Sequence, residues 1–285
     1  MQKPPRDGLQ DAVATVRTLR GENGCPWDKA QTHESLRKYL LEETYEVLEA
    51  LDSHAARPSK ESVDHFKEEL GDLLLQILLH SEIASQAGNF SVSDVAGELS
   101  DKLIRRHPHV FGNDKLHTPE EVLGAWEKNK AKEKPRFSAL DGIPPALPAL
   151  QRSLKVIEKV SKVGFQWPDL KGPLEKVSEE LGELQAELDK LPQPVSRESA
   201  EKLTPEQKRT LEAELGDLLF TISNVAHFLH LNPEDALRSM LARFEGRFRS
   251  VEDGAKAQGR KLEEMTLNEM DTLWSQAKLL EKNKP

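Results

Sequence analysis

Apolar residues recur at three- and four-residue steps along most of the chain, which is the spacing of one face of a helix. The segment from Ser35 to about Asp52 predicts one long helix, with strong helix formers between its apolar positions. The segment from Val63 to about Ala87 predicts a second, and its many apolar positions are typical of a helix in a protein interior. No stretch alternates apolar and polar residues for long enough to predict a strand. The pattern therefore predicts an all-α fold.

The same periodicity predicts further helices on both sides of these two, separated by segments rich in glycine, proline or polar residues. They span residues 11–20, 92–106, 119–132, 150–163, 174–190, 205–230, 232–254 and 267–281. Two of the intervening segments carry a tryptophan and are predicted to be loops, at residues 21–28 and 164–169. A turn is expected at 107–109, and residues 191–204 have the composition of a mobile loop.

Proline and glycine concentrate between Lys134 and Pro148, where neither a helix nor a strand would tolerate them. We therefore predict an N-terminal helical domain at residues 1–134, a proline-rich linker at 135–148 and a C-terminal helical domain at 149–285. The order of helices and tryptophan loops in the first domain returns in the second. Such self-similarity indicates a tandem repeat.

An acidic pattern occurs in each half and is the strongest sign of this repeat. Glu-Glu-x-x-Glu on one predicted helix is followed, on the next long helix, by Glu-Leu-Gly-Asp. The residues are Glu42, Glu43, Glu46, Glu69 and Asp72 in the first half, and Glu179, Glu180, Glu183, Glu214 and Asp217 in the second. Because residues three apart are neighbours on one helix face, two facing helices can converge four carboxylates.

A pair of basic residues and a Trp-x-x-x-Lys stretch follow the acidic pattern in both halves. They are Lys102, Arg106, Trp126 and Lys130 in the first half, and Arg243, Arg247, Trp274 and Lys278 in the second. Alone, the cations would be interpreted as a solvated surface and the tryptophans as core residues. Their recurrence in one order favours a shared site, in which the cations hold phosphate oxygens and a tryptophan stacks on a base.

Leucines surround both Glu-x-x-Asp pairs, whereas most paired carboxylates on charged helices belong to a solvated face. Burying several like charges is unfavourable without a counter-charge, and neither Glu-x-x-Asp stretch contains a lysine or arginine. A divalent cation would neutralise them. Oxygen-only ligands favour Mg²⁺ first and Mn²⁺ second over zinc, and Mg²⁺ sites usually keep positions for substrate phosphates.

The composition narrows the possible partners. With 40 Lys and Arg against 49 Asp and Glu, the formal charge is −9, which disfavours general attraction to nucleic acid or to an anionic membrane. Apolar runs are far shorter than the roughly 20 residues of a membrane-spanning helix. Cys25 is the one cysteine, and the first residues lack the apolar core of a signal peptide. We therefore expect a cytoplasmic protein that binds neither membranes nor nucleic acid, with Cys25 as a structural thiol.

These motifs resemble the MazG-type nucleoside triphosphate pyrophosphohydrolases over nearly the whole chain. The most specific are the two acidic patterns, Gly-Cys-Pro-Trp-Asp at 24–28, Arg-His-Pro-His-Val-Phe at 106–111 and Val-Gly-Phe-Gln-Trp-Pro-Asp at 163–169. The resemblance implies an all-α fold in which tandem helical domains dimerise into four-helix-bundle-like modules. It also implies Mg²⁺-dependent hydrolysis of NTPs and dNTPs, with broad base tolerance, to the monophosphate and pyrophosphate, in a nucleotide-pool housecleaning role.

The resemblance also assigns roles to individual residues. It implies metal ligands at Glu180, Glu183, Glu214 and Asp217 in the second half, and at Glu43, Glu46, Glu69 and Asp72 in the first. It implies nucleotide contacts at Lys176, Arg243, Arg247, Trp274 and Lys278, and internal analogy adds Lys102, Arg106, Trp126 and Lys130. Glu42 or Glu179, next to these ligands, is our candidate for positioning water or acting as a general base.

The second half carries the fuller set of matches, so we expect it to be catalytic, while the role of the first half stays open. Two features depart from the family pattern. Residues 191–204 lengthen the link between the second pair of acidic helices, and Gly246, between Arg243 and Arg247, is expected to loosen the basic pair.

Two other functions remain open on the sequence. One is a non-enzymatic helical interaction protein, and the other is a narrower hydrolase of the same superfamily, acting on dUTP or a phosphoribosyl nucleotide. A ferritin-like di-iron bundle would need Glu-x-x-His, which does not occur. Each half contributes about two long helices with a carboxylate face, and a second subunit would complete a four-helix arrangement most simply, so we expect a homodimer.

Overall fold

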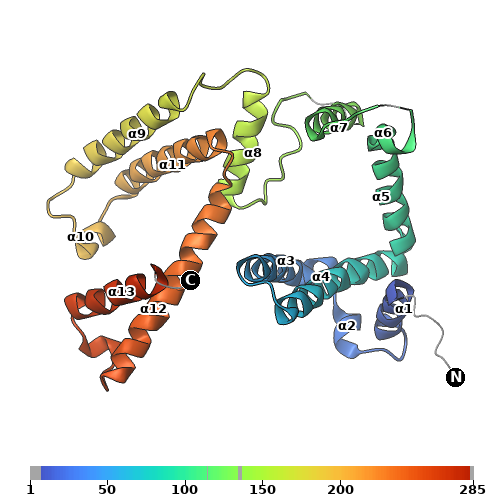
Figure 1. The fold of residues 1–285 in the computed structure, drawn as a ribbon, viewed down its shortest axis with the longest axis horizontal. Helices are drawn as coiled ribbons and strands as arrows, with labels where there is room; N and C mark the ends of the chain where they lie inside the picture. The colour runs from blue at the N-terminus through green and yellow to red at the C-terminus, as the bar shows by residue number, and fades with distance from the viewer. Residues whose placement is uncertain (1–7, 114, 134–136, 283–285) are drawn as a thin grey trace. The chain divides into compact units, whose positions relative to one another are not determined.

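The computed structural model describes residues 8–113, 115–133 and 137–282, and these residues form helices and connections without a strand (Figure 1). The all-α prediction is therefore confirmed. The chain divides into two compact units, Met1–Pro135 and Arg136–Pro285, which we call unit 1 and unit 2. The division lies at the start of the segment predicted to be a linker, and Lys159 of unit 2 donates a hydrogen bond to the carbonyl of Asp141 in that segment, at 2.6 Å.

Unit 1 is built around a hairpin of two long helices. Its elements are α1 (Gly8–Arg20), α2 (Pro26–Ala30), α3 (His33–Ala56), α4 (Lys60–Gln86), α5 (Val92–Arg106), α6 (Pro108–Phe111) and α7 (Pro119–Glu133). Helices α3 and α4 form the hairpin, α1 packs on α4, and α5 contacts α4, α6 and α7 (Figure 1).

Unit 2 repeats this plan. Its elements are α8 (Ala149–Ser161), α9 (Lys171–Asp189), α10 (Arg197–Glu201), α11 (Pro205–Phe228), α12 (Pro233–Ala257), the 3₁₀ turn η1 (Leu262–Glu264) and α13 (Leu267–Lys282). Helices α9 and α11 form the hairpin, and α8 packs on α11 and α12. Helix α13 packs on α12, so that α12 and α13 make a second hairpin (Figure 1).

Serine and threonine side chains decide where the long helices begin. Thr32 caps α3 and Ser59 caps α4, each by accepting a hydrogen bond from the backbone N–H three residues on. Because of the Ser59 cap, α4 starts at Lys60, three residues before the predicted start, and α3 continues four residues beyond its predicted end. The hairpin connection is therefore only three residues long, which holds the two helices antiparallel.

Three short helices lie in segments where the sequence predicted loops or a turn. Helices α2 and α6 begin with Pro26 and Pro108, and proline is favoured at the first helical position because it has no N–H to leave unpaired. Helix α10 begins after Ser196, which forms a capping box with Ser199. Local backbone chemistry therefore gives single helical turns that are too short for hydrophobic periodicity to detect.

The buried apolar residues form a separate core in each unit. In unit 1, Val16, Leu36, Leu78 and Leu79 pack together between α1, α3 and α4. In unit 2, Val251, Ala255, Met265 and Leu273 pack between α12 and α13. None of the helices in the described ranges is both long and apolar enough to cross a membrane.

The interior position predicted for the helix at 63–87 is found on only part of α4, where Leu78 and Leu79 are buried. Leu70 and Ile77 on α4 are each 44% exposed, and Leu219 and Ile222 on α11 are 44% and 42% exposed. Each hairpin therefore leaves an apolar face in contact with solvent. Contiguous apolar surface of this kind usually marks an interaction site.

Candidate metal and nucleotide site

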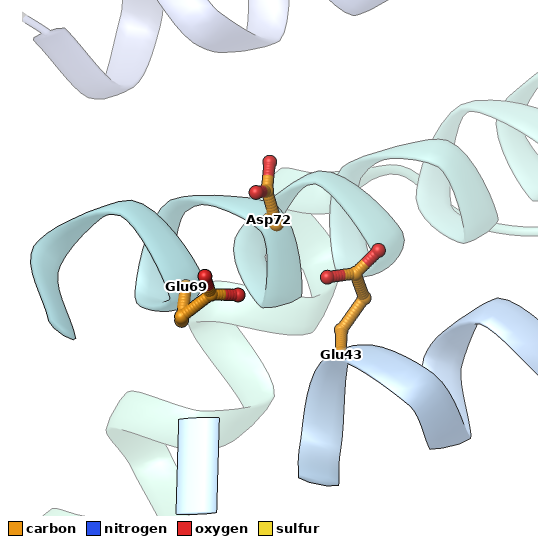
Figure 2. A group of neighbouring side chains, drawn as sticks. All are labelled: Glu43, Glu69 and Asp72. Atoms are coloured by element: carbon orange, nitrogen blue, oxygen red, sulfur yellow. The ribbon is translucent and has the colours of Figure 1, made fainter. Parts of the chain in front are cut away.

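The hairpin of unit 1 brings three of the predicted metal ligands together. Glu43 extends from α3 toward α4, where Glu69 and Asp72 lie one turn apart (Figure 2). Each residue offers one carboxylate oxygen, and the three oxygens lie within 4.8 Å of one another. Glu46, one turn along α3, is exposed and lies outside this group. We call Glu43, Glu69 and Asp72 the first cluster.

Burial makes the first cluster electrostatically unfavourable as it stands. Glu69 is only 9% exposed, and its Oε2 has no hydrogen-bond partner, although His65 Nδ1 lies 3.1 Å from the other oxygen. Burial raises the pKa of Glu69, and the charge of Glu46 raises it further. The pKa of Glu43 is raised by burial and by the charges of Asp72 and Glu46. Both shifts show that negative charge is costly here.

The hairpin of unit 2 forms an equivalent group. Glu180 and Glu183 on α9 and Glu214 on α11 each place a carboxylate oxygen within 4.8 Å of the other two. Asp217, the fourth predicted ligand, is exposed and lies outside the group. We call Glu180, Glu183 and Glu214 the second cluster. The pKa of Glu183 is raised by burial and by its hydrogen bond and charge interaction with Glu180.

A lysine distinguishes the second cluster from the first. Lys176 Nζ lies 2.7 Å from Glu180 Oε1 and 2.9 Å from Glu179 Oε1. Its hydrogen bonds to Glu179 and Glu180 raise the pKa of Lys176. Sequence reasoning placed Lys176 among the nucleotide contacts, whereas here it neutralises an acid of the second cluster. Glu179, the candidate base, is an exposed partner of the same lysine, and Glu42 is exposed on α3.

The residues of both clusters fit a hard divalent cation. Each cluster offers three carboxylates from two rigid helices, and carboxylate oxygen is the ligand that Mg²⁺ and Mn²⁺ prefer. In the first cluster, the buried and unpartnered Glu69 Oε2 is a donor atom in need of a positive partner. Glu43, Glu69 and Asp72 would hold a cation in unit 1, and Glu180, Glu183 and Glu214 would hold one in unit 2.

An arginine lies beside a tryptophan in both units, a contact that the sequence analysis did not predict. In unit 2, the Arg247 guanidinium lies 5.8 Å from the ring centre of Trp274, and Phe244 packs against that ring at 4.9 Å. In unit 1, the Arg106 guanidinium lies 5.1 Å from Trp126, with His107 in the place of the phenylalanine at 4.8 Å. Each contact is a cation–π interaction on an aromatic surface suited to stacking.

An open depression of about 500 Å³ lies beside Arg247, lined also by Ser275, Lys278, Leu279 and Glu281. Glu281 Oε2 accepts from Arg247 Nε at 2.7 Å. Arg243 is exposed one turn earlier on α12. In unit 1, Lys102 is half-buried one turn before Arg106 on α5, and the side chain of Lys130 lies outside the described residues.

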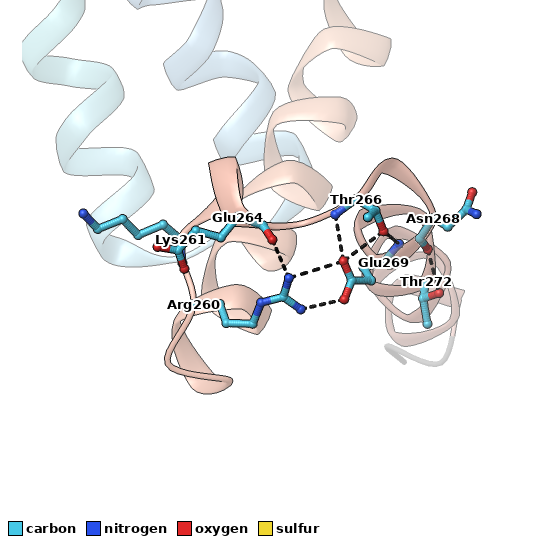
Figure 3. Close-up of polar contacts among 7 residues, drawn as sticks. All are labelled: Arg260, Lys261, Glu264, Thr266, Asn268, Glu269 and Thr272. Atoms are coloured by element: carbon cyan, nitrogen blue, oxygen red, sulfur yellow. Dashed lines mark hydrogen bonds and ion pairs between the residues drawn. The ribbon is translucent and has the colours of Figure 1, made fainter.

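A polar clamp that sequence reasoning missed fixes the start of α13 (Figure 3). Glu269 Oε2 accepts hydrogen bonds from the backbone N–H of Thr266 at 2.7 Å and from its hydroxyl at 2.9 Å. Arg260 Nη1 donates to Glu269 Oε1 at 2.6 Å, and Arg260 also donates to the carbonyl of Glu264. The detectable signal was Thr-x-x-Glu directly before an apolar run, a capping box. In unit 1, Thr118 and Glu121 form the same box before Trp126.

A glycine lets α12 and α13 approach closely at the same hairpin. A Cβ atom at Gly254 would lie 2.8 Å from Leu273 Cδ2, closer than real side chains come. Leu273 directly precedes Trp274 and is buried. The clamp and this contact together set the position of the tryptophan relative to Arg247.

In unit 2, Lys176 is the one predicted basic contact that meets the acidic cluster among the described residues, and the basic pair and the Trp-x-x-x-Lys residues lie elsewhere. Among the described residues of unit 2, no hydrogen bond or ion pair links Arg243, Arg247 or Lys278 to the second cluster. The acids lie on α9 and α11, whereas Trp274 and Lys278 lie on α13, which packs on α12 and stands apart from α9 in Figure 1. One unit alone therefore presents two parts of a site.

His227, His230 and Cys25 do not form a metal group within the described residues. His227 packs against Phe228, and His230 is exposed after the end of α11 with φ 54°. Cys25 is a free thiol whose backbone N–H donates to the carbonyl of Leu19.

Comparison with known proteins identifies the class. The family model for the MazG nucleotide pyrophosphohydrolase domain matches twice, at residues 31–111 and 171–251. The chain belongs to this family, which confirms the resemblance predicted from the motifs. Each match contains one acidic cluster, whereas Trp126 and Trp274 lie outside the matched residues.

Named relatives extend over nearly the whole chain. The nucleoside triphosphate pyrophosphohydrolase/pyrophosphatase MazG of Thermotoga maritima is 40% identical over 95% of both chains. The nucleoside triphosphate pyrophosphohydrolase of Escherichia coli K12 is 40% identical over 94% of this chain and 96% of its own length. The nucleoside triphosphate pyrophosphohydrolase of Mycobacterium tuberculosis is 45% identical over 55% of this chain and 46% of its own.

Proposed function

We propose that this protein hydrolyses nucleoside triphosphates, both NTPs and dNTPs with broad base tolerance, to the monophosphate and pyrophosphate, with Mg²⁺ as cofactor. The observation that carries the proposal is the pair of three-carboxylate clusters on two-helix hairpins inside a nucleotide pyrophosphohydrolase family. The names of relatives that match along the whole chain support the triphosphate as substrate. We further propose that it acts in the cytoplasm as a housecleaning enzyme of the nucleotide pool.

The chain's own residues supply the remaining parts of such a reaction. A bound Mg²⁺ would supply Lewis-acid polarisation of phosphate oxygens and screening of their charge. Lys176, Arg243, Arg247 and Lys278 would bind the triphosphate through charge-assisted hydrogen bonds. The ring of Trp274 would stack on the base, and stacking tolerates different bases because each has a π-face.

Water activation is assigned to a carboxylate next to the ligands. Glu179 and Glu42 are exposed and directly precede Glu180 and Glu43 in the chain. A carboxylate at that position would accept a proton from the water that attacks phosphorus. Glu179 also pairs with Lys176, so movement of the lysine toward phosphate would free Glu179 for this role.

Unit 2 is proposed as the catalytic unit. It carries Lys176, Arg243, Arg247, Trp274 and Lys278, whereas unit 1 has Tyr39 at the position that corresponds to Lys176, four residues before the first glutamate of the cluster. Lys102, Arg106, Trp126 and Lys130 would form a second, weaker nucleotide site in unit 1.

A homodimer would complete both parts of the site. The exposed leucine and isoleucine side chains of α4 and α11 would be covered by equivalent helices of a second copy, as in a four-helix bundle. Leu219→Glu should then reduce the mass in solution to that of one chain and lower activity. A wild-type protein that is monomeric at micromolar concentration would refute the dimer.

The test of the proposed function is a panel of NTPs and dNTPs with and without Mg²⁺, in which pyrophosphate and orthophosphate are measured separately. Pyrophosphate and the monophosphate should appear together, in equal amounts, with every base and only with the metal. Activity confined to dUTP or to a phosphoribosyl nucleotide would show instead a hydrolase of the same superfamily with a narrower substrate range. Orthophosphate as the first product would overturn the proposal in favour of a phosphatase.

A further inference from the structure

The two acidic clusters have similar geometry and different counter-charges. In both, three carboxylate oxygens from two helices lie within 4.8 Å of one another. The second cluster has the Lys176 ammonium 2.7 Å from Glu180 Oε1. The first has a buried Glu69 Oε2 without a partner. The second cluster therefore has an ammonium on its buried carboxylate, whereas the first has only the half-exposed imidazole of His65, which lies 3.1 Å from Glu69 Oε1.

This difference follows from one position in the repeat. Lys176 lies four residues before Glu180, one turn away on the same face of α9, so its ammonium reaches the carboxylate. Tyr39 lies four residues before Glu43 on α3 and brings no charge. The neighbouring Lys38 does not replace the missing cation, because its ammonium lies over the Tyr39 ring, 4.5 Å from the centre.

We infer that Lys176 is an internal counter-ion that competes with a divalent cation for Glu180, so that unit 1 binds the cation on its own and unit 2 binds it tightly only when a triphosphate draws Lys176 away. The inference rests on the proposed function for the identity of the triphosphate. A positive group and a divalent cation repel each other, and both would use the carboxylate of Glu180, a residue that is 5% exposed. In the first cluster, His65 contacts Glu69 Oε1, and the other oxygen, Oε2, has no partner and stays available to a cation.

Lys176 has a second partner that prepares it for this exchange. It lies 2.9 Å from Glu179, an exposed side chain, so the ammonium sits between the buried cluster and the solvent. An arriving triphosphate offers several negative oxygens on the solvent side. Transfer of the ammonium to phosphate would release Glu180 to the metal and Glu179 to the water in one movement. The lysine would thereby couple metal binding in unit 2 to substrate binding.

The test is Mn²⁺ binding to the full chain without nucleotide, measured by electron paramagnetic resonance. The wild type should hold one tight Mn²⁺ per chain, lost in Glu69→Gln and retained in Glu180→Gln. Lys176→Met should tighten the second site about tenfold, or about 1.4 kcal/mol, and thus add a second bound ion. Lys171→Met removes the same charge from the same helix, where Lys171 pairs with exposed Glu175 at 3.5 Å, and should change nothing.

A reciprocal variant in unit 1 tests the same inference even if Lys176→Met does not fold correctly. Tyr39→Lys places a lysine one turn before Glu43 and should weaken Mn²⁺ binding in unit 1 by about tenfold, with helicity by circular dichroism as the check on folding. Two equally tight Mn²⁺ ions in the wild type would overturn the inference. So would a Lys176→Met variant that binds no more tightly than Lys171→Met, or a wild-type ion that is lost in Glu180→Gln and kept in Glu69→Gln.

Failure of this inference and failure of the proposed function give different results. Pyrophosphate release together with two equal Mn²⁺ sites would remove the counter-ion role of Lys176 and leave the enzyme reaction intact. Unequal Mn²⁺ sites without pyrophosphate release would support Lys176 as a counter-ion of Glu180. They would show that a triphosphate is not the ligand that draws Lys176 away.

Discussion

Units 1 and 2 solve the same problem, one buried carboxylate beside two others between two helices, in two ways. Unit 2 places a lysine one turn away and neutralises Glu180 within the chain. Unit 1 leaves Glu69 Oε2 without a partner, and burial raises the pKa of that carboxyl. A repeated motif can therefore keep the positions of its carboxylates while one neighbouring residue changes whether the site needs a cation from solution.

Loss of catalysis is the largest effect that we expect, and it tests most directly whether units 1 and 2 differ in function. Glu180→Gln and Glu214→Gln remove a charged ligand from the proposed catalytic cluster, so pyrophosphate release should fall about 10²–10³-fold, roughly 3–4 kcal/mol of barrier. Glu43→Gln and Glu69→Gln should reduce the rate less than tenfold. The measurement is the initial rate with Mg²⁺ and ATP.

The matched control for these variants is Glu175→Gln on α9, which removes an exposed carboxylate outside the cluster and should leave the rate unchanged. Equal losses in units 1 and 2 would mean that both units carry out the reaction, and full activity of Glu180→Gln and Glu214→Gln would end the assignment to unit 2.

The stability of the two cores should show whether the units unfold separately. Leu36 is fully buried in unit 1 and Ile157 is 2% exposed in unit 2, so replacing either with alanine leaves a cavity that costs about 2–5 kcal/mol. If the units are independent, each variant should shift only one unfolding transition in urea. Leu41→Ala, at a side chain 52% exposed, is the control and should shift neither. A single transition moved equally by both core variants would show that the units unfold together.

Two glycines on α12 should respond in opposite directions to the same substitution. Gly254→Ala pushes a methyl group into Leu273 and should destabilise unit 2 by about 1–3 kcal/mol. Gly246→Ala meets nothing within 4 Å and should stabilise the helix by about 0.4–1 kcal/mol, because glycine loses more entropy on folding.

The same pair tests whether Gly246 loosens the basic residues around it. Urea unfolding gives the stabilities, and the KM for ATP reports on Arg243 and Arg247. If flexibility of the helix at Gly246 helps Arg243 and Arg247 to reach phosphate, Gly246→Ala should raise the KM for ATP although the variant is more stable. A Gly254→Ala variant as stable as the wild type would contradict the close helix contact.

Loss of the clamp at the start of α13 should have the smallest effect on stability. The stabilisation by this clamp should decrease as the pH falls. Arg260 and the backbone N–H of Thr266 lower the pKa of Glu269 to about 2. Its folded pKa is below the unfolded value, about 4.3, so the stabilisation is complete above that value and is lost as the pH falls toward 2. Glu269→Gln should therefore lower the melting temperature at pH 7, and the difference from the wild type should shrink in acid. A difference that is constant between pH 7 and pH 2 would show that the charge of Glu269 is not what stabilises the hairpin.

Much of the site was predictable because its signals are local in the chain. Helical spacing places Glu180 beside Glu183, and the repeat placed Glu214 on the facing helix, as the second cluster shows. Arg247 and Trp274 were expected to bind the phosphate and the base of one nucleotide, and the cation–π contact between them was not predicted. Lys176 and Glu180 are also one turn apart, so their ion pair could have been read from the sequence. Lys176 was assigned to phosphate instead, so its ion pair with Glu180 was not predicted.

Other features depend on packing between segments that are distant in sequence. The composition of α4 predicted burial, but in one unit alone Leu70 and Ile77 face solvent because α3 and α1 cover only part of the helix. Glu46 and Asp217 match the acidic pattern and still lie outside the two clusters, on exposed positions of their helices. Spacing along a helix gives the face on which a residue lies and does not give the distance to the next helix.

The sequence by itself determined the long helices, the tandem repeat and the residue types of a hard-metal site, because helical periodicity and ligand chemistry act over a few neighbouring positions. Only the tertiary structure decided which three acids of each motif converge, that Glu69 Oε2 is left without a partner, and that the Arg–Trp pair is held on a separate hairpin. These outcomes depend on how far apart two helices pack and on which side chains fill the space between them.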